Sequence, residues 1–118
     1  MNDYTEEQLD RLFFALSDQS RRSMLRQLSE GDANVSELGY PLGQSKQLVS
    51  KHLKVLENAG LITKQKDGRI QRCHFNPQAL AQVQKVIEQY KVFWNKQFSA
   101  LEDYIEQTKF KGENKNGK

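Results

Sequence analysis

The chain lacks most of the residues on which disulfide, metal and membrane proteins depend. Its 118 residues include one cysteine, Cys73, and two histidines, His52 and His74. One cysteine excludes a disulfide within the chain and a zinc site built from several cysteines. No apolar run approaches the roughly 20 residues that a membrane-spanning helix needs. The sequence therefore predicts no metal site, no cofactor and no membrane partner.

Hydrophobic residues are also scarce, at 36% of the chain with a mean hydropathy of −0.82. This composition favours an elongated helical protein that shares its core with a second subunit, and a monomer with a solvated tail is the alternative. The acidic N-terminus lacks the apolar segment of a signal peptide, which predicts a cytoplasmic protein. Residues 1–108 are predicted to form one domain. Residues 109–118 are polar and basic and predict a disordered tail.

Hydrophobic spacing and capping residues predict four helices in the first half of the chain. Apolar residues recur at three- and four-residue intervals near the N-terminus, which predicts a helix over about 5–17. Asp18 is a candidate N-cap for a second helix that ends at Gly31. Asn34 has Glu37 at the capping-box spacing and begins a short third helix that ends before Pro41. Ser45 is the candidate N-cap of a fourth helix, over about 46–58.

A hairpin and a long helix follow. Asp67-Gly68 joins two β-prone runs and is a strong signal for a two-residue type I′ turn, with the hairpin over about 62–75. A final helix is predicted over about 77–108. Two helices joined through a short glycine-containing turn form a helix-turn-helix. The predicted fold is mainly α with a small β-hairpin (α+β), in the order α-α-α-α-β-β-α, which is a winged helix-turn-helix.

Positive charge is concentrated in residues 44–75, which hold seven Lys or Arg and two acids, whereas the whole chain carries only +3. A basic helix and hairpin are typical of a protein that binds duplex DNA, although a solvated surface is the alternative. Gln47 suits adenine, a lysine suits guanine, and a serine suits either. The candidate DNA-binding residues are Ser45, Lys46, Gln47, Ser50, Lys51, His52 and Lys54 in the helix, and Lys64, Lys66, Arg69 and Arg72 in the wing.

Several residues allow two interpretations. His52 is either a packing residue or a contact at the DNA surface. Arg21 and Arg22 open the second helix, and one of them suits a phosphate contact, but an intramolecular ion pair is at least as well supported. Cys73 stands beside His74, whose imidazolium would favour a reactive thiolate. Adjacent strand residues point to opposite faces, so a structural cysteine is the better interpretation.

The final helix carries an apolar face that is too wide for a solvated helix. Its first turns are expected to pack against the domain, and the remainder against a second copy of the chain. The aromatic residues are better explained by packing than by a ligand pocket. The predicted dimer contacts are Leu9, Leu12, Val86, Tyr90, Phe93, Trp94 and Leu101.

Three segments together resemble the ArsR-type family of bacterial winged-helix repressors. They are ALSDQSRRSMLRQL at 15–28, NVSELGYPLGQSKQLVSKHLKVLENAGLI at 34–62, and KDGRIQRCHFNP at 66–77. The resemblance implies a homodimer joined through its terminal helices. Its two recognition helices would bind successive major grooves of a near-palindromic operator, with half-sites about 34 Å apart. The metal-sensing members of the family carry paired cysteines in the third helix or Asp and His ligands in the last helix, and neither set is present here.

The leading prediction is thus a dimeric, sequence-specific transcriptional repressor that does not respond to metals, with an unidentified effector as a further partner. A low-specificity architectural DNA-binding protein and a winged-helix protein-interaction module are the alternatives. Catalysis is not predicted, because the sequence has no nucleophile–base pattern and no glycine-rich phosphate loop.

Overall fold

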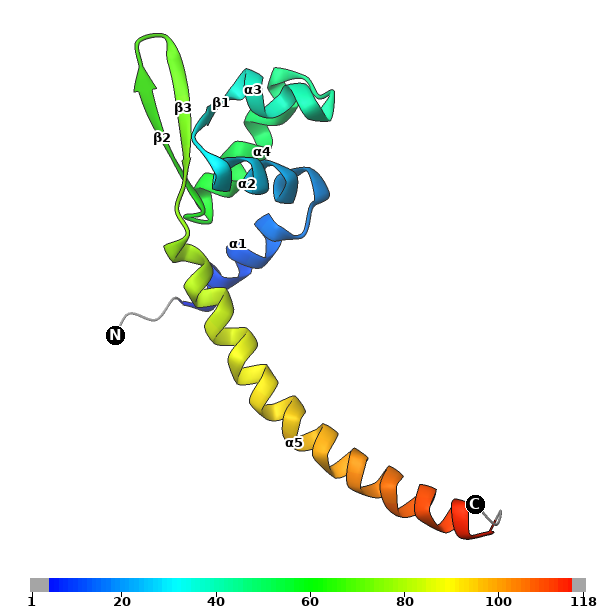
Figure 1. The fold of residues 1–118 in the computed structure, drawn as a ribbon. Coiled ribbons are helices and arrows are strands. Elements are labelled where there is room, and N and C mark those ends of the chain that lie inside the picture. The colour runs from blue at the N-terminus through cyan, green and yellow to red at the C-terminus, as the bar shows by residue number, and fades with distance from the viewer. Residues whose placement is uncertain (1–4, 116–118) are drawn as a thin grey trace. The chain divides into compact units, whose positions relative to one another are not determined.

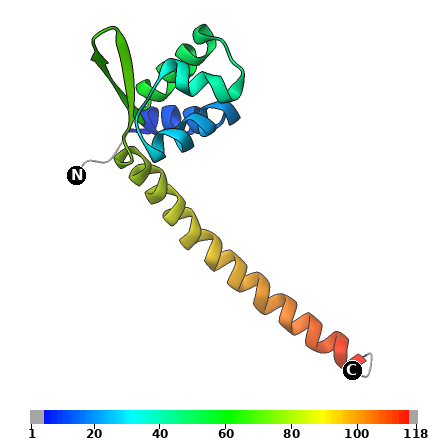
Figure 2. The same ribbon diagram turned by 45° about the horizontal axis from the view of Figure 1, so that its top comes forward.

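The computed structural model describes the backbone of residues 5–115 and the side chains of residues 5–108. The elements are α1 (Glu6–Leu16), α2 (Gln19–Glu30), β1 (Ala33–Asn34), α3 (Val35–Gly39), the 3-10 helix η1 (Tyr40–Leu42), α4 (Lys46–Asn58), β2 (Ile62–Asp67), β3 (Ile70–Phe75) and α5 (Gln78–Lys115). The hairpin of β2 and β3 stands beside the helices in both views (Figure 1, Figure 2). The prediction of a mainly helical winged helix-turn-helix is confirmed.

Side chains close to each helix start explain where the helices begin. The side chains of Asp18, Asn34 and Ser45 accept hydrogen bonds from backbone N–H groups three residues later, as predicted. Glu37 returns a bond to the Asn34 N–H at 2.9 Å, which completes the expected capping box. Thr5 caps α1 in the same way, which places the start of α1 at Glu6. These bonds satisfy donors that the first turn of a helix leaves free.

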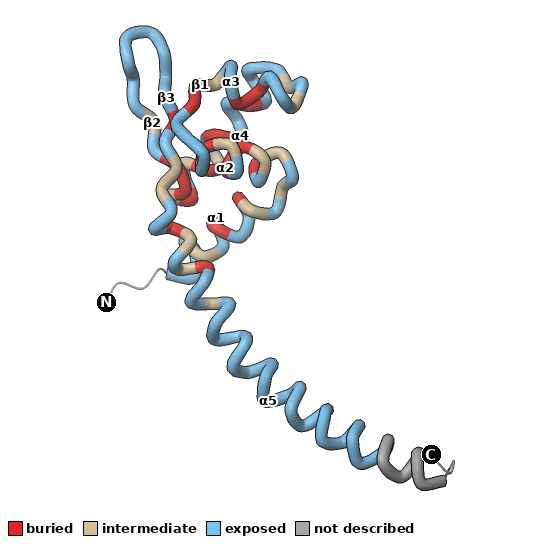
Figure 3. The backbone as a smooth tube through the Cα atoms, viewed as in Figure 1, coloured by how far each residue is buried: buried red, intermediate tan, exposed pale blue. Residues whose placement is uncertain are grey.

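The core of the N-terminal unit, which ends at Val83, is built from the inner faces of the helices and the hairpin. The fully buried side chains include Leu12, Met24, Leu38, Val49, Leu53, Leu56, Leu61, Ile62 and Cys73 (Figure 3). The inward face of α4 is formed by Val49, Leu53 and Leu56. The helix-turn-helix is tightly packed at Gly39, where an added Cβ would lie 2.7 Å from the Val49 Cγ2 atom. This close approach fixes α3 against α4.

The sheet has three strands in the order β1-β3-β2, all antiparallel. The short strand β1 was not predicted from the sequence. It places Ala33 opposite Cys73 and Asn34 opposite Arg72, so the base of the wing is tied to the residue that caps α3. The wing is therefore held to the helix-turn-helix by hydrogen bonds on its β3 edge as well as by the chain connection after α4.

The hairpin turn differs from the prediction by one residue. Asp67 still belongs to β2, and Gly68 and Arg69 form the two-residue loop. Gly68 has a φ of +68°, and among the described residues only glycines have positive φ. A type I′ turn needs positive φ at both central positions, whereas a type II′ turn needs it only at the first. The backbone thus follows the type II′ pattern, and Arg69 occupies the second position of the loop.

Helix α5 contributes to both units of the chain, because the boundary falls after Val83. Ala79 and Val83 are buried in the N-terminal core and Leu80 packs against it, as expected for the first turns. The helical backbone continues to Lys115, past the predicted end at Thr108, so the prediction of disorder from residue 109 is not supported for 109–115. Residues 116–118 of the predicted tail lie outside the described residues.

Candidate nucleic-acid interface

Helix α4 presents one polar face to solvent and buries the other. Ser45 accepts a hydrogen bond from the Leu48 N–H at 3.2 Å and so fixes the first turn. Because the buried residues recur along the opposite side, the solvent side is mainly polar, although Leu48 is also exposed. The outer face of α4 is defined by five exposed polar residues, Lys46, Gln47, Ser50, Lys51 and Lys54. The structure thus brings these five predicted residues onto one accessible surface.

A groove of about 440 Å³ lies between the outer face of α4 and the tip of the wing. Its lining residues come from β1, α3, α4 and the hairpin, and they are Asn34, Val35, Ser36, Lys46, Ser50, Arg69, Ile70 and Gln71. None of these eight residues is acidic, and two are cationic. Five of them were not predicted as site residues, namely Asn34, Val35, Ser36, Ile70 and Gln71. Their position depends on the pairing of β1 with β3, for which the two-residue strand gives no usable sequence signal.

The four predicted wing cations are not equivalent. Lys66 and Arg69 are exposed at and near the tip. The Lys64 Nζ atom lies 3.3 Å from a Glu57 carboxylate oxygen, and its side chain is only 15% exposed. Lys64 is paired with Cys73 in the register and so shares its inward face. Arg72 is exposed and lies 3.9 Å from the Asp67 carboxylate. Lys64 is therefore engaged within the fold rather than available at the surface.

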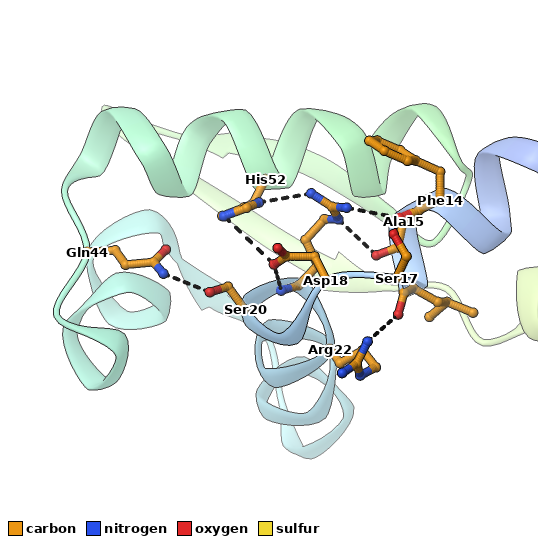
Figure 4. Close-up of polar contacts among 10 residues, drawn as sticks. Phe14, Ala15, Ser17, Asp18, Ser20, Arg22, Gln44 and His52 are labelled. Carbon is orange, nitrogen blue, oxygen red and sulfur yellow. Dashed lines mark hydrogen bonds and ion pairs between the residues drawn. The ribbon is translucent and has the colours of Figure 1, made fainter.

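His52 lies on the flank of α4 that faces α2. Its Nδ1 atom is 3.2 Å from the Arg21 Nη1 atom, and its Nε2 atom is 4.0 Å from an Asp18 carboxylate oxygen (Figure 4). The side chain is 14% exposed. These contacts support the packing interpretation of His52. Arg21 is buried and Arg22 donates to the Leu16 carbonyl at 2.7 Å, so both arginines interact within the chain.

Cys73 is fully buried, and burial raises the pKa of its thiol. The neighbouring His74 points elsewhere, because its Nδ1 atom lies 2.8 Å from an Asp32 carboxylate oxygen. A buried thiol with a raised pKa is poorly reactive, since the thiolate is the nucleophile. The surroundings of Cys73 therefore agree with a structural role.

Two predicted dimer contacts in α1 differ in accessibility. Leu12 has no exposed surface within a single chain, so it has none left to bury against a second copy. An apolar stripe does not distinguish the core of a subunit from its interface, so the dimer contact at Leu12 stays a prediction that its burial in the single chain disfavours. Leu9 is half-buried and packs against the same core.

In the C-terminal unit, large apolar side chains of α5 are exposed. They are Ile87, Tyr90, Val92, Phe93, Trp94, Phe98, Leu101, Tyr104 and Ile105, and Val86 is half-buried. Trp94 stacks on Phe98 with ring centroids 5.5 Å apart, and Phe93 meets Trp94 edge-on at 6.1 Å. Most of these residues recur at three- and four-residue intervals along α5, so the helix carries an exposed apolar face.

The residues of α3 do not fit a metal. The segment Val35-Ser36-Glu37-Leu38-Gly39 has no thiolate or imidazole, and the Glu37 carboxylate accepts the Asn34 N–H. Within residues 5–108, no three His, Cys, Asp or Glu side chains gather in a way that would hold a metal ion. Nor does any helix in the described part of the chain have the length and hydrophobicity to cross a membrane.

The arrangement of a helix-turn-helix with a basic outer face and a hairpin wing defines a winged-helix DNA-binding fold. The pattern described as "Bacterial regulatory protein, arsR family" matches residues 18–64. The HTH-type transcriptional regulator Rv2034 of Mycobacterium tuberculosis is 31% identical over 97 residues, which cover 82% of this chain and 88% of the relative. The chain belongs to the ArsR family of bacterial transcriptional regulators.

Solved structures agree with this assignment. The crystal structure of the ArsR family transcriptional regulator RHA00566 superposes with a TM-score of 0.74 at 33% identity, covering 80% of this chain and 97% of that one. The winged helix-turn-helix domain of Mb0332 from Mycobacterium bovis, described as homodimeric, shares the fold with a TM-score of 0.60 at 22% identity, covering 76% of this chain and 93% of that domain.

Proposed function

We propose that the chain is a dimeric, sequence-specific repressor that binds duplex DNA in the cytoplasm and does not respond to metals. The observation that carries the proposal is the groove between α4 and the wing tip. A winged helix places its recognition helix in the major groove and its wing near the adjacent minor groove, so one DNA strand passes between them. A groove lined by Lys46, Ser50 and Arg69 without a single acid suits the phosphates of that strand.

Sequence specificity is assigned to the outer face of α4. Gln47, Ser50 and Lys51 are exposed on this face and have side chains that match base edges in the major groove. A protein that binds only the DNA backbone has no need of a glutamine at the centre of its contact surface. These residues favour a specific repressor over an architectural protein, and the positive charge of the surface disfavours a protein-interaction module.

Dimerisation is assigned to the exposed apolar face of α5. Phe93, Trp94 and Leu101 are about half exposed in the single chain, and burying them would recover the hydrophobic free energy that the isolated chain forgoes. The Mb0332 domain, which shares the fold, is described as homodimeric, which supports a dimer without specifying its interface. A two-fold dimer implies a near-palindromic operator with half-sites one helical turn, about 34 Å, apart.

Independence from metals is inferred from the donor set of α3 and from the absence of histidine in α5. Exposed carboxylates alone are poor ligands for soft thiophilic metals. Adding zinc or arsenite to a preformed protein–DNA complex should therefore leave the complex intact, and release of the DNA by either would contradict this part of the proposal.

The direct test is binding of the purified protein to the DNA upstream of its own coding sequence, compared with an unrelated duplex of equal length, at two salt concentrations. Preference for the upstream DNA that persists at the higher salt supports a specific repressor, and a footprint gives the half-site spacing. Equal, salt-sensitive binding to both duplexes would favour the architectural alternative. Binding to neither would favour the protein-interaction module.

A further inference from the structure

Arg21 connects three helices through one buried guanidinium group. It lies in α2 and is only 7% exposed. Its Nε and Nη2 atoms donate to the carbonyl oxygens of Ala15 and Phe14 at 2.9 Å each, at the C-terminal end of α1. Its third contact, from Nη1, is to the His52 Nδ1 atom of α4 at 3.2 Å. A single side chain of α2 thus holds both the end of α1 and the flank of the predicted recognition helix.

The chemistry of this contact fixes the state of the imidazole. A guanidinium group has donors and no acceptor, so the His52 Nδ1 atom must accept the hydrogen bond. Only a neutral imidazole with its proton on Nε2 can do this, and that N–H faces the Asp18 carboxylate at 4.0 Å. The Asp18 carboxylate itself accepts the Arg21 backbone N–H at 3.1 Å, and this bond lowers the pKa of Asp18.

His52 is well placed to set the rotation of α4 about its axis. It immediately follows Lys51 and lies on the flank between the buried stripe and the outer face. A small rotation of a recognition helix moves every side chain on its outer face relative to the base edges. Hydrophobic contacts at Val49 and Leu53 are non-directional, whereas the hydrogen bond to Arg21 is directional and therefore selects one rotation.

We propose that Arg21 and His52 are positioning residues for DNA binding, and that they hold α4 in its binding orientation only while the His52 imidazole is neutral. The proposal rests on the DNA-binding function proposed above. Neither residue is assigned a contact with DNA: Arg21 is buried, and His52 acts through Arg21.

Protonation of His52 would break the contact. It places an N–H on Nδ1 opposite a guanidinium that can only donate, and it sets two cations side by side. Among the interactions that the described residues make with His52, the charged groups are Arg21 and Asp18, both from the start of α2. Helix α1 adds no charge, because it presents two carbonyl oxygens and the Phe14 ring to Arg21. Asp18 is the more distant of the two and is already engaged, so it offsets the repulsion only in part. Acidification should thus release α4 and weaken DNA binding.

The test is the pH dependence of binding to the upstream duplex, from pH 8 to pH 5, where imidazoles titrate. His52→Asn keeps an acceptor oxygen at the δ position but cannot be protonated, and it should bind within about threefold of the wild type at pH 7.5. His52→Leu removes the acceptor and should lose about tenfold in affinity at each half-site, the lower end for a lost bond to a charged donor. The wild type should lose affinity on acidification relative to His52→Asn, by at most about tenfold per pH unit for the one proton of each subunit and so about a hundredfold for a dimer.

His74→Asn is the matched control, because the chain has only two histidines and His74 pairs with Asp32 on the surface. Its pH profile should parallel that of the wild type. A wild-type profile that follows His52→Asn, or one that is flattened by His74→Asn instead, would overturn the proposal.

A readout without DNA separates the positioning proposal from the function on which it rests. The imidazole ¹⁵N shifts of the free protein at pH 7.5 should show His52 protonated at Nε2 with Nδ1 accepting a hydrogen bond, and Arg21→Lys should remove that signature. A His52 proton on Nδ1 would refute the positioning proposal even if DNA binds. If His52 has the expected tautomer but the protein binds no DNA at any pH, the proposed function is refuted. Helix α4 then has no DNA-binding orientation for the Arg21–His52 contact to hold.

Discussion

Reversing the charge of Lys51 tests the assignment of the outer face of α4 most directly. Lys51 is exposed near the middle of the helix, between Ser50 and His52. It faces away from the buried Leu53, so Lys51→Glu should leave the fold of the N-terminal unit intact. We expect the variant to lose operator binding while remaining folded and dimeric.

The magnitude follows from the electrostatics of DNA. A lysine charge in the major groove neutralises about one DNA charge even where its ammonium group binds a base, and one such charge contributes about 0.9 to the slope of log affinity against log salt, which at about 0.1 M salt corresponds to roughly eightfold in affinity. Reversing the charge removes the contact and adds a repulsion of similar size, so each half-site loses about 60-fold. A dimer carries the change twice, which predicts a loss of about 10³ to 10⁴ in operator affinity and a salt slope smaller by about 3.6, which is about 0.9 for each of the two charge steps at each half-site.

Fluorescence anisotropy with a labelled upstream duplex, at several salt concentrations, measures both quantities. Arg26→Glu is the matched control, since it makes the same change of charge on α2, beside Gln27 and Pro41 and outside the groove. The control should change affinity by much less than Lys51→Glu. Equal effects of the two variants would mean that only net charge matters, and an unchanged affinity for Lys51→Glu would refute the assignment of α4 as the recognition helix.

Three further predictions concern stability and assembly. Leu12→Ala should cost about 2–5 kcal/mol in the free energy of unfolding, because Leu12 is fully buried and leaves a cavity; urea unfolding at saturating dimer concentration tests this, and a stable variant with weakened dimers would restore Leu12 to the interface. Asp18→Ala should cost about 1 kcal/mol as a lost N-cap. The Arg21 N–H lowers the pKa of Asp18 below its ordinary value of 3.8. The stabilisation by the ionised cap is therefore fully present above 3.8 and is lost as the pH falls through the lowered value. The difference in unfolding free energy between the wild type and Asp18→Ala should be smaller near pH 3 than at pH 7. Trp94→Ala should weaken the dimer by at least about tenfold, the effect of losing one buried aromatic anchor, and sedimentation of a variant that stays dimeric at low concentration would place the interface elsewhere.

Features that depend on nearby residues were predictable from the sequence. The N-caps at Asp18, Asn34 and Ser45 were correct because a cap is a hydrogen bond across three residues, and its donors and acceptors are visible in the sequence. Features that depend on distant pairing were not. Strand β1 has only two residues, and it forms because β3 offers it a free edge. The turn was displaced by one residue because Asp67-Gly68 and Gly68-Arg69 both place a glycine where positive φ is needed.

The charged residues of the candidate site show the same contrast between what nearby residues predict and what depends on distant pairing. The sequence alone does not show which of the seven Lys and Arg residues between 44 and 75 are free of ion pairs. The structure does, because their side chains point in different directions. Strand alternation turns Lys64 to the inner side of the wing, where Glu57 neutralises it, and Arg72 lies near Asp67. In the part of the chain that the structure describes, no ion pair involves the other five, which are Lys46, Lys51, Lys54, Lys66 and Arg69. These five lie on α4 and the outer part of the wing, and two of them line the groove, Lys46 from α4 and Arg69 from the wing tip. This distribution suits the proposed passage of a DNA strand between the two elements. Local net charge identifies a basic segment, whereas only the register of the hairpin and the rotation of α4 determine which of its charges are free to meet a phosphate.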